Sequence, residues 1–231
     1  MKLNVLYEDN HLLVVEKPRN MPIQEDVSKD LDLLNEAKQY LINKYNKPGD
    51  AFLGLVHRLD RPVGGVVLFA KTSKAASRIS NEIRLRRFDR RYLAVVRGIP
   101  EKKNDQLVDY LLKDHHKNKS QVVSSSTKDA KKAVLDYKVL ASDLKKDLSL
   151  LSIQLHTGRS HQIRVQLSHL GHAIYGDQKY GQAVNKVGQQ IALWAVELSV
   201  NHPTKKEPIN VTCPPPNEYP WNLFDYSFKK I

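Results

Sequence analysis

The sequence of 231 residues has a single cysteine, Cys213, and no long apolar run. One cysteine can form neither an intramolecular disulfide nor a zinc site built from several thiolates. The longest apolar runs, such as residues 64–70, are far too short to span a bilayer. Residues 1–17 alternate in character and carry acids early, unlike a signal peptide. These absences predict a soluble, cytoplasmic protein that does not act in a membrane.

Motifs of several enzyme classes are also missing. The chain has no GxxxxGK[ST] phosphate-binding loop and no GxSxG turn, so nucleotide hydrolysis and serine-hydrolase chemistry have no support. Four histidines could be proposed as metal ligands: His156, His161, His169 and His172. Their spacing matches no metal motif and no acid cluster accompanies them. We therefore expect no metal and no cofactor, which also disfavours a metal-dependent nuclease or phosphoesterase.

Positive charge is what the chain has in excess. It contains 37 Lys and Arg against 25 Asp and Glu, a net charge of +12. A basic surface can serve solubility alone. It can also bind a polyanion, because each neutralised phosphate releases counterions. The charge therefore favours a nucleic-acid partner without identifying it.

The apolar pattern predicts an α+β fold, with a mixed, largely antiparallel sheet flanked by helices and loops. Strands outnumber helices and often follow one another without a crossover helix. Residues 101–132 are polar and rich in lysine, which predicts long loops or a ribbon. No linker or change of composition is visible, so one domain over residues 1–231 is expected. The predicted strands are 3–7, 12–17, 66–70, 90–98, 133–141, 148–156 and 191–200, and the predicted helices 30–46, 72–87 and one from about 161.

The segment VHRLDRPVGGVVLFAKT, residues 56–72, has an unusual arrangement of charge. Asp60 lies between Arg58 and Arg61, a proline follows, and two glycines lead into the apolar run 66–70. The carboxylate of Asp60 thus lies between two cations in the sequence, where the following proline and glycines interrupt regular secondary structure.

The segment LHTGRSHQIRVQLSHLG, residues 155–171, is the second unusual one. Ser160 can cap a helix that starts near His161. Arg164 is then carried on a rigid element at the edge of the core and needs an anion, either a carboxylate or a phosphate. Arg159 and Arg164 flank the helix start, where the dipole attracts anions. A structural salt bridge is the alternative interpretation of Arg164.

These segments resemble motifs of the RluA-type RNA pseudouridine synthases. HRLDRPVGGVVLFAKT is similar to their aspartate motif, RRYLAVVRG to their tyrosine motif, and LHTGRSHQIRVQLSHLGHAIYGDQKYG to their arginine motif. The resemblance runs from Asn4 to Pro216 and implies a catalytic domain without the N-terminal RNA-binding domain of many relatives. Val63 and Gly64 stand where members usually have Thr-Ser, which we interpret as altered loop packing.

The resemblance implies an active site of three residues. Asp60 corresponds to the catalytic aspartate, and Arg164 to the arginine that pairs with it and favours its ionised form. Tyr92 matches the active-site tyrosine, whose ring can stack on uracil and whose hydroxyl can touch Asp60 or transfer a proton. Without the resemblance, Tyr92 would be an ordinary strand aromatic. Whether Asp60 attacks the sugar carbon or removes a ribose proton stays open.

The implied reaction is the isomerisation of specific uridines in structured ribosomal or transfer RNA to pseudouridine, with the base flipped out of its stack. We expect an RNA stem-loop as the partner, no obligate protein partner, and a monomer. The alternative is a catalytically dormant RNA-binding or RNA-folding factor on the same fold. Residues 113–132 are either an RNA contact or a solvated loop. The candidate RNA-binding residues are His57, Arg58, Arg61, Arg159 and His161.

Overall fold

The computed structural model describes residues 2–225, which form two compact units. The first unit holds residues 2–90 and 195–214, and the second holds residues 91–194 and 215–225. The expectation of one domain over residues 1–231 stays a prediction.

The first unit is built on antiparallel strand pairs. β1 pairs with β2, β2 and β3 both pair with β4, and β10 pairs with β11. Its strands are β1 (Val5–Glu8), β2 (Leu12–Lys17), β3 (Gly54–Leu55), β4 (Gly64–Ala70), most of β10 (Leu193–Asn201) and β11 (Pro208–Thr212). The connections between β1 and β2 (residues 9–11) and between β10 and β11 (residues 202–207) are short, and each of these strands pairs with its neighbour in the sequence.

β4 is the buried centre of the first unit. All of its residues are buried, which confirms the predicted strand over 66–70 and extends it to Gly64. Gly65 has a φ of +119°, and a Cβ there would lie 2.2 Å from the backbone oxygen of Ala195 in β10. Only glycine fits this close approach.

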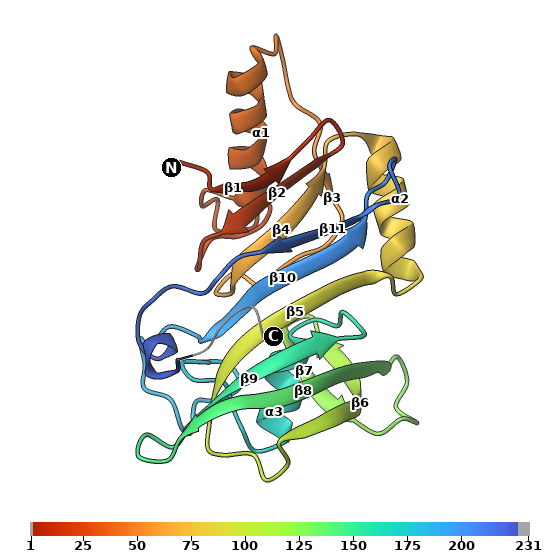
Figure 1. The fold of residues 1–231 in the computed structure, drawn as a ribbon. Coiled ribbons are helices and arrows are strands. Elements are labelled where there is room, and N and C mark those ends of the chain that lie inside the picture. Colours follow the sequence, from red (N-terminus) through yellow and green to blue (C-terminus); the bar gives the residue numbers. More distant parts are fainter. Residues whose placement is uncertain (1, 226–231) are drawn as a thin grey trace. The chain divides into compact units, whose positions relative to one another are not determined.

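Two capped helices complete the first unit (Figure 1). α1 (Leu33–Tyr45) begins after Asp32, whose side chain accepts a hydrogen bond from the Asn35 N–H group at 3.0 Å. α2 (Ser73–Arg84) begins after Thr72, whose hydroxyl accepts from the Ala75 N–H group at 3.1 Å; the sequence predicts either Thr72 or Ser73 as this cap. α2 packs against β3 and β4 and so covers the strand that follows Asp60.

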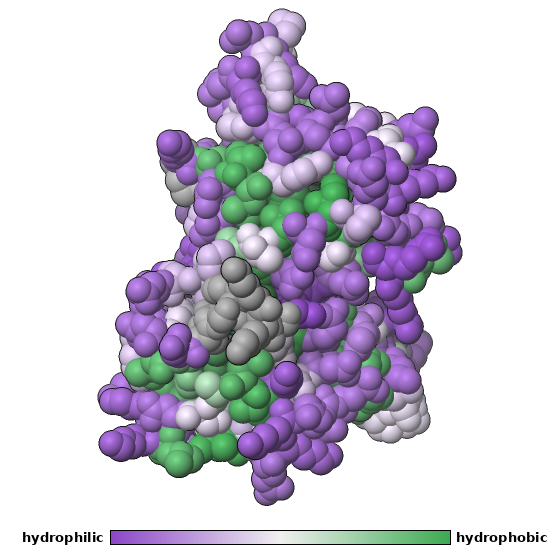
Figure 2. Space-filling view, viewed as in Figure 1, coloured by the Kyte–Doolittle hydropathy of each residue, from purple (hydrophilic) through white to green (hydrophobic). Residues whose placement is uncertain are grey.

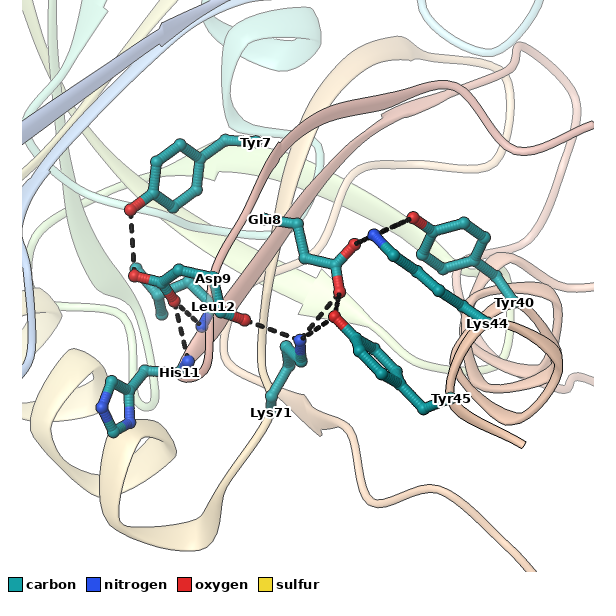
Figure 3. A network of polar contacts seen from close by, with 9 residues as sticks. All are labelled: Tyr7, Glu8, Asp9, His11, Leu12, Tyr40, Lys44, Tyr45 and Lys71. Atoms are coloured by element: carbon teal, nitrogen blue, oxygen red, sulfur yellow. Dashed lines mark hydrogen bonds and ion pairs between the residues drawn. The ribbon is translucent and has the colours of Figure 1, made fainter. Parts of the chain in front are cut away.

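A polar network around Glu8 ties α1 to the β1–β2 hairpin (Figure 3). The Glu8 carboxylate, 7% exposed, accepts hydrogen bonds from Lys44 at 2.7 Å and Lys71 at 2.8 Å. The hydroxyls of Tyr40 and Tyr45 donate to it at 2.8 and 2.6 Å. This carboxylate is therefore fully surrounded by donors, a structural role that needs no ligand.

The second unit is an antiparallel sheet with one helix. Its strand order is β5-β9-β8-β6-β7, and α3 packs against β6 and β7. The polar stretch 101–132 contains the β6–β7 hairpin, so the ribbon was the correct one of the two predicted alternatives. The elements are most of β5 (Phe88–Arg97), β6 (Asn104–Asp114), β7 (Lys119–Val123), β8 (Lys131–Asp143), β9 (Leu148–Leu155), α3 (Gln162–His169) and a 3-10 turn (Trp221–Leu223).

The fold class predicted from the sequence is confirmed. Every strand pairing named above is antiparallel, and helices lie against the strands of both units. Within residues 2–225, no helix combines the length and apolar character that crossing a bilayer requires.

Candidate active site

Asp60 lies in the loop between β3 and β4, where the chain turns before it enters the buried strand. The Val63 N–H group donates to the Asp60 carbonyl at 3.0 Å and closes a turn over Arg61 and Pro62. Asp60 is half-buried, whereas Val63 is 2% exposed. The turn thus fixes the backbone of Asp60 just before a buried strand, which suits a residue whose side chain must keep one position.

Lys17, the last residue of β2, is a buried cation beside this turn. It is 0% exposed, and its Nζ donates to the carbonyls of Pro18 at 2.8 Å and Arg61 at 2.9 Å. Burial lowers the pKa of Lys17 to about 7, while the charge of Asp60 acts in the opposite direction. Because Arg61 follows Asp60 directly, Lys17 fixes the backbone of the turn.

Lys17 is a buried residue that was not predicted from the sequence. Lysine is almost never fully buried, so its default interpretation is a solvated strand end. The available signals were weak: it follows a buried apolar run, Leu12–Val15, and precedes a proline that stops the strand.

His57 is a buried, neutral side chain. Its Nε2 accepts a hydrogen bond from the Leu68 N–H group at 2.9 Å, so the proton is assigned to Nδ1. Burial lowers the pKa of His57 to about 3, and the charge of Arg90 lowers it further. Within the described chain Nδ1 has no hydrogen-bond partner. The predicted RNA contact of His57 stays a prediction, and it could use only this nitrogen.

The two arginines beside Asp60 differ in their surroundings. Arg58 is exposed and forms no hydrogen bond or ion pair with residues 2–225. Arg61 donates to the Ser28 hydroxyl at 3.0 Å. It also forms ion pairs with the carboxylates of Asp26 and Asp30. A phosphate could bind Arg58 directly but would have to displace carboxylates from Arg61.

In the second unit, α3 carries Arg164 into the interior, where it is 5% exposed. Its Nε and Nη2 donate to the two carboxylate oxygens of Asp177, both at 2.8 Å. Burial alone would raise the pKa of Asp177, but the hydrogen bonds and charge of Arg164 outweigh it and lower the pKa. The anion that Arg164 was predicted to need is present in the structure as the carboxylate of Asp177.

Tyr180 braces the other side of Arg164. The guanidinium carbon of Arg164 lies 5.2 Å from the centroid of the Tyr180 ring, within the range of a cation–π contact. The Tyr180 hydroxyl accepts from the Ser120 N–H group at 2.8 Å and is hydrogen-bonded to Nδ1 of His161 at 2.7 Å. The arginine is thus held from two sides, and His161 belongs to its support.

The start of α3 differs from the prediction in one detail. The N-cap is His161, in the left-handed region with a φ of 56°, rather than Ser160. The Ser160 carbonyl accepts from the Ser120 hydroxyl at 2.9 Å, so this residue serves the contact with β7. The cap prediction was wrong because a tertiary contact decides the local backbone. Arg159 is exposed and donates from Nε to the Lys132 carbonyl at 2.9 Å.

Tyr92 lies in β5 opposite Ile153 of β9 and is 5% exposed. It shares the second unit with Arg159, His161 and Arg164, whereas His57, Arg58, Asp60 and Arg61 belong to one segment of the first unit. The predicted site residues thus fall into two groups, and each group is described within its own unit.

Comparison with known proteins decides the family. The family model described as RNA pseudouridylate synthase matches residues 11–169, a span that includes Asp60, Tyr92 and Arg164. The chain belongs to the RNA pseudouridine synthase family. Members of this family are isomerases that act on RNA, so the resemblance seen in the sequence is confirmed.

Individual pseudouridine synthases match most of the chain. The ribosomal large subunit pseudouridine synthase C of Buchnera aphidicola is 31% identical over 91% of this chain and 67% of that protein. The ribosomal large subunit pseudouridine synthase D of Zymomonas mobilis is 30% identical over 94% of this chain and 70% of that protein. The solved structure of human RNA pseudouridylate synthase domain containing 4 shares the fold, with a TM-score of 0.77 and 23% identity over 92% of this chain and 88% of that one.

Proposed function

We propose that this pseudouridine synthase isomerises specific uridines in structured RNA, with Asp60 as the catalytic carboxylate and with the target base flipped out. The bond from the ribose carbon C1′ to N1 of uracil breaks, and a bond from C1′ to C5 forms. N1 gains a proton and C5 loses one, so no oxidant or cofactor is consumed. Asp60 either attacks C1′ or removes a ribose proton to start this sequence.

The observation that carries the proposal is the anchored turn of Asp60. A buried cation, Lys17, holds the carbonyl of the next residue, Arg61, and the turn leads directly into the fully buried β4. A surface aspartate in a merely structural loop needs no such anchor. A half-buried carboxylate held on a rigid strand end is the arrangement that a nucleophile or base requires.

Tyr92 and Arg164 are proposed to act with Asp60. The support is their family match and the way the second unit restrains Arg164, between Asp177 and the Tyr180 ring. In this proposal Arg164 orients the reactive carboxylate and Tyr92 stacks on uracil. His57, Arg58, Arg61, Arg159 and His161 are proposed to position the RNA.

Ribosomal RNA is the proposed substrate class, with transfer RNA as the alternative. The two relatives from Buchnera and Zymomonas carry names that assign them to the large ribosomal subunit. The proposal further includes a cytoplasmic location and a monomer that needs no protein partner. A dormant RNA-binding or RNA-folding factor is the rival function, which would have no need of an anchored Asp60.

A carbodiimide-based map of pseudouridine in total cellular RNA tests the proposal. It compares cells with the wild-type protein, without it, and with Asp60→Ala. Asp50→Ala is the matched control, because Asp50 is an exposed aspartate of the same unit that pairs with Lys38. We expect one or more sites to disappear without the protein and with Asp60→Ala, and to remain with Asp50→Ala. Sites that persist with Asp60→Ala would contradict the catalytic assignment.

A further inference from the structure

The turn that ends α2 displays three arginines around an exposed leucine. Arg84, Arg86 and Arg87 are all exposed, and Leu85 between them is 43% exposed. Figure 2 shows hydrophilic residues dominating the face over α2. The favourable placement of cations at a helix C-terminus explains Arg84, but it does not explain the residues beyond the last turn.

Arg86 occupies a position that normally calls for glycine. The N–H groups of Arg86 and Arg87 donate to the carbonyls of Ile83 and Glu82, at 3.1 and 2.9 Å, which is the hydrogen-bond pattern of a Schellman motif. Arg86 is its left-handed residue, with a φ of 58°. A side chain with a Cβ is disfavoured there, so glycine can replace Arg86 without straining the backbone.

The arginines of this region divide by their partners. Arg84 donates to Asn81 at 2.8 Å, and Arg87 pairs with Glu82 at 3.1 Å. The guanidinium group of Arg86 forms no hydrogen bond or ion pair anywhere in residues 2–225.

Arg90, four residues beyond Arg86, also has no acceptor within the described chain. Its Nε is buried and unpaired, and its guanidinium carbon lies 5.6 Å from the Phe88 ring centroid. A buried guanidinium donor without an acceptor is costly. Arg90 as a residue is only half-buried, so its guanidinium group can meet an anion from outside the chain.

These arginines lead from the end of α2 to the Asp60 turn. The Phe88 ring, which Arg90 covers, lies 5.1 Å from the His57 ring, centroid to centroid. His57 is followed by Arg58, which is exposed and also lacks an internal partner. Arg58, Arg86 and Arg90 all belong to the first unit, and we call them the arginine track.

We propose that the arginine track binds consecutive phosphates of the RNA strand that carries the target uridine. The inference rests on the proposed function and adds Arg86 and Arg90 to its RNA contacts. Guanidinium groups without carboxylate partners are free to form bidentate bonds to phosphate. Arg61, already paired with Asp26 and Asp30, is not part of the track.

Arg86→Gly is the variant that separates binding from folding. Glycine removes the guanidinium and relieves the left-handed backbone, so its melting temperature should equal or exceed that of the wild type. Lys206→Gly is the matched control. Lys206 is an exposed cation of the same unit with a φ of 62°, so the substitution changes charge and backbone freedom in the same way.

The measurement is the affinity for a fluorescein-labelled RNA stem-loop by fluorescence anisotropy, over a series of salt concentrations. Arg86→Gly should weaken binding about threefold to tenfold and reduce the slope of log affinity against log salt by about 0.7 to 0.9, the value for one phosphate contact. Adding Arg58→Gln should about double the loss of slope. Lys206→Gly should keep the wild-type slope.

Equal weakening by Arg86→Gly and Lys206→Gly would overturn the track, because net charge alone would then explain binding. Wild-type affinity and slope in Arg86→Gly would overturn it as well. Both results leave the proposed function intact if the wild-type protein forms pseudouridine in RNA. A wild-type protein that binds the stem-loop but forms no pseudouridine would instead overturn the proposed function.

Discussion

Two buried cations, one in each unit, are stabilised in opposite ways. Lys17 donates its hydrogen bonds to two backbone carbonyls, those of Pro18 and Arg61. Arg164 donates to both oxygens of a carboxylate, that of Asp177. Lys17 is 0% exposed and Arg164 5%, so burial does not distinguish them.

The two cations differ in how far their hydrogen-bond partners neutralise the buried positive charge. Carbonyl dipoles do not neutralise a whole charge, so burial lowers the pKa of Lys17 to about 7 despite the opposing charge of Asp60. A carboxylate does neutralise it, and an arginine keeps its proton at any ordinary pH. The charge of Arg164 is therefore fixed, while the charge of Lys17 can change near neutral pH.

The largest effect should come from breaking the compensated pair. Asp177→Leu leaves Arg164 buried without its bidentate partner and should lower the free energy of unfolding by about 3–5 kcal/mol. Urea unfolding monitored by circular dichroism measures this loss. Replacing both residues, as Arg164→Met with Asp177→Leu, should restore most of it. A loss below about 1 kcal/mol in the single variant would contradict the compensation.

Lys17, whose charge is not neutralised by a carboxylate, should make the stability of the protein depend on pH. The folded-state pKa of Lys17 is lowered below its unfolded value, so the unfolded chain binds more protons between the two values. Stability from this group therefore rises from about pH 7 to pH 10, by on the order of 3 kcal/mol. Unfolding titrations of the wild type and of Lys17→Met across this range isolate the contribution. Parallel curves for the two proteins would show that Lys17 does not contribute to the pH dependence of stability.

Activity should also depend on Lys17. Lys17→Met removes the donor that fixes the Arg61 carbonyl and so loosens the turn of Asp60. We expect kcat for pseudouridine formation to fall about a hundredfold through misplacement of the carboxylate. KM should change by about threefold or less, because Lys17 is buried and does not contact RNA. A rise in KM with an unchanged kcat would assign Lys17 to RNA binding instead.

The smallest effect concerns Glu8, a buried anion compensated by lysines. Burial alone would raise the pKa of Glu8, but hydrogen bonds from Lys44, Lys71 and Tyr45 help lower it to about 2. The folded-state pKa is lowered, so this stabilisation is present at neutral pH and is lost as the pH falls from about 5 to about 2. Tyr45→Phe should cost about 1 kcal/mol at pH 7.

The stability of the same Tyr45→Phe variant should approach that of the wild type near pH 2, where Glu8 is half protonated and much of the network's advantage is gone. Tyr219→Phe is the control. The Tyr219 hydroxyl forms no hydrogen bond within residues 2–225. Equal losses for the two variants at pH 7 would show that the Glu8 network adds nothing specific. Thermal unfolding at several pH values makes the measurement.

Local features of the fold could be predicted from the sequence. The apolar run 66–70 indicated a strand buried on both faces, and β4 is buried throughout. Thr72 and Ser73 were the two predicted caps of the following helix, and Thr72 is the one that caps it. Both signals are local: a run of apolar side chains, and a hydroxyl one residue before a helix.

For the charged contacts, the sequence predicted that a partner is needed but did not predict which residue provides it. The sequence indicated that Arg164 needs an anion, but not that Asp177, thirteen residues away, supplies it. The signals for the burial of Lys17 were weak, because its acceptors are backbone carbonyls that any sequence provides. The cap at His161 in place of Ser160 has the same origin, a contact between distant elements that overrides local preference.

The most direct test of the account uses purified protein and RNA labelled with tritium at C5 of uridine. Formation of the new bond to C5 releases the label into water. Asp60→Asn keeps the size of the side chain and removes its capacity to act as a nucleophile or base. We predict tritium release by the wild type and none by Asp60→Asn, with RNA affinity unchanged to within about threefold. Release by Asp60→Asn at the wild-type rate would contradict the central claim that Asp60 carries the chemistry.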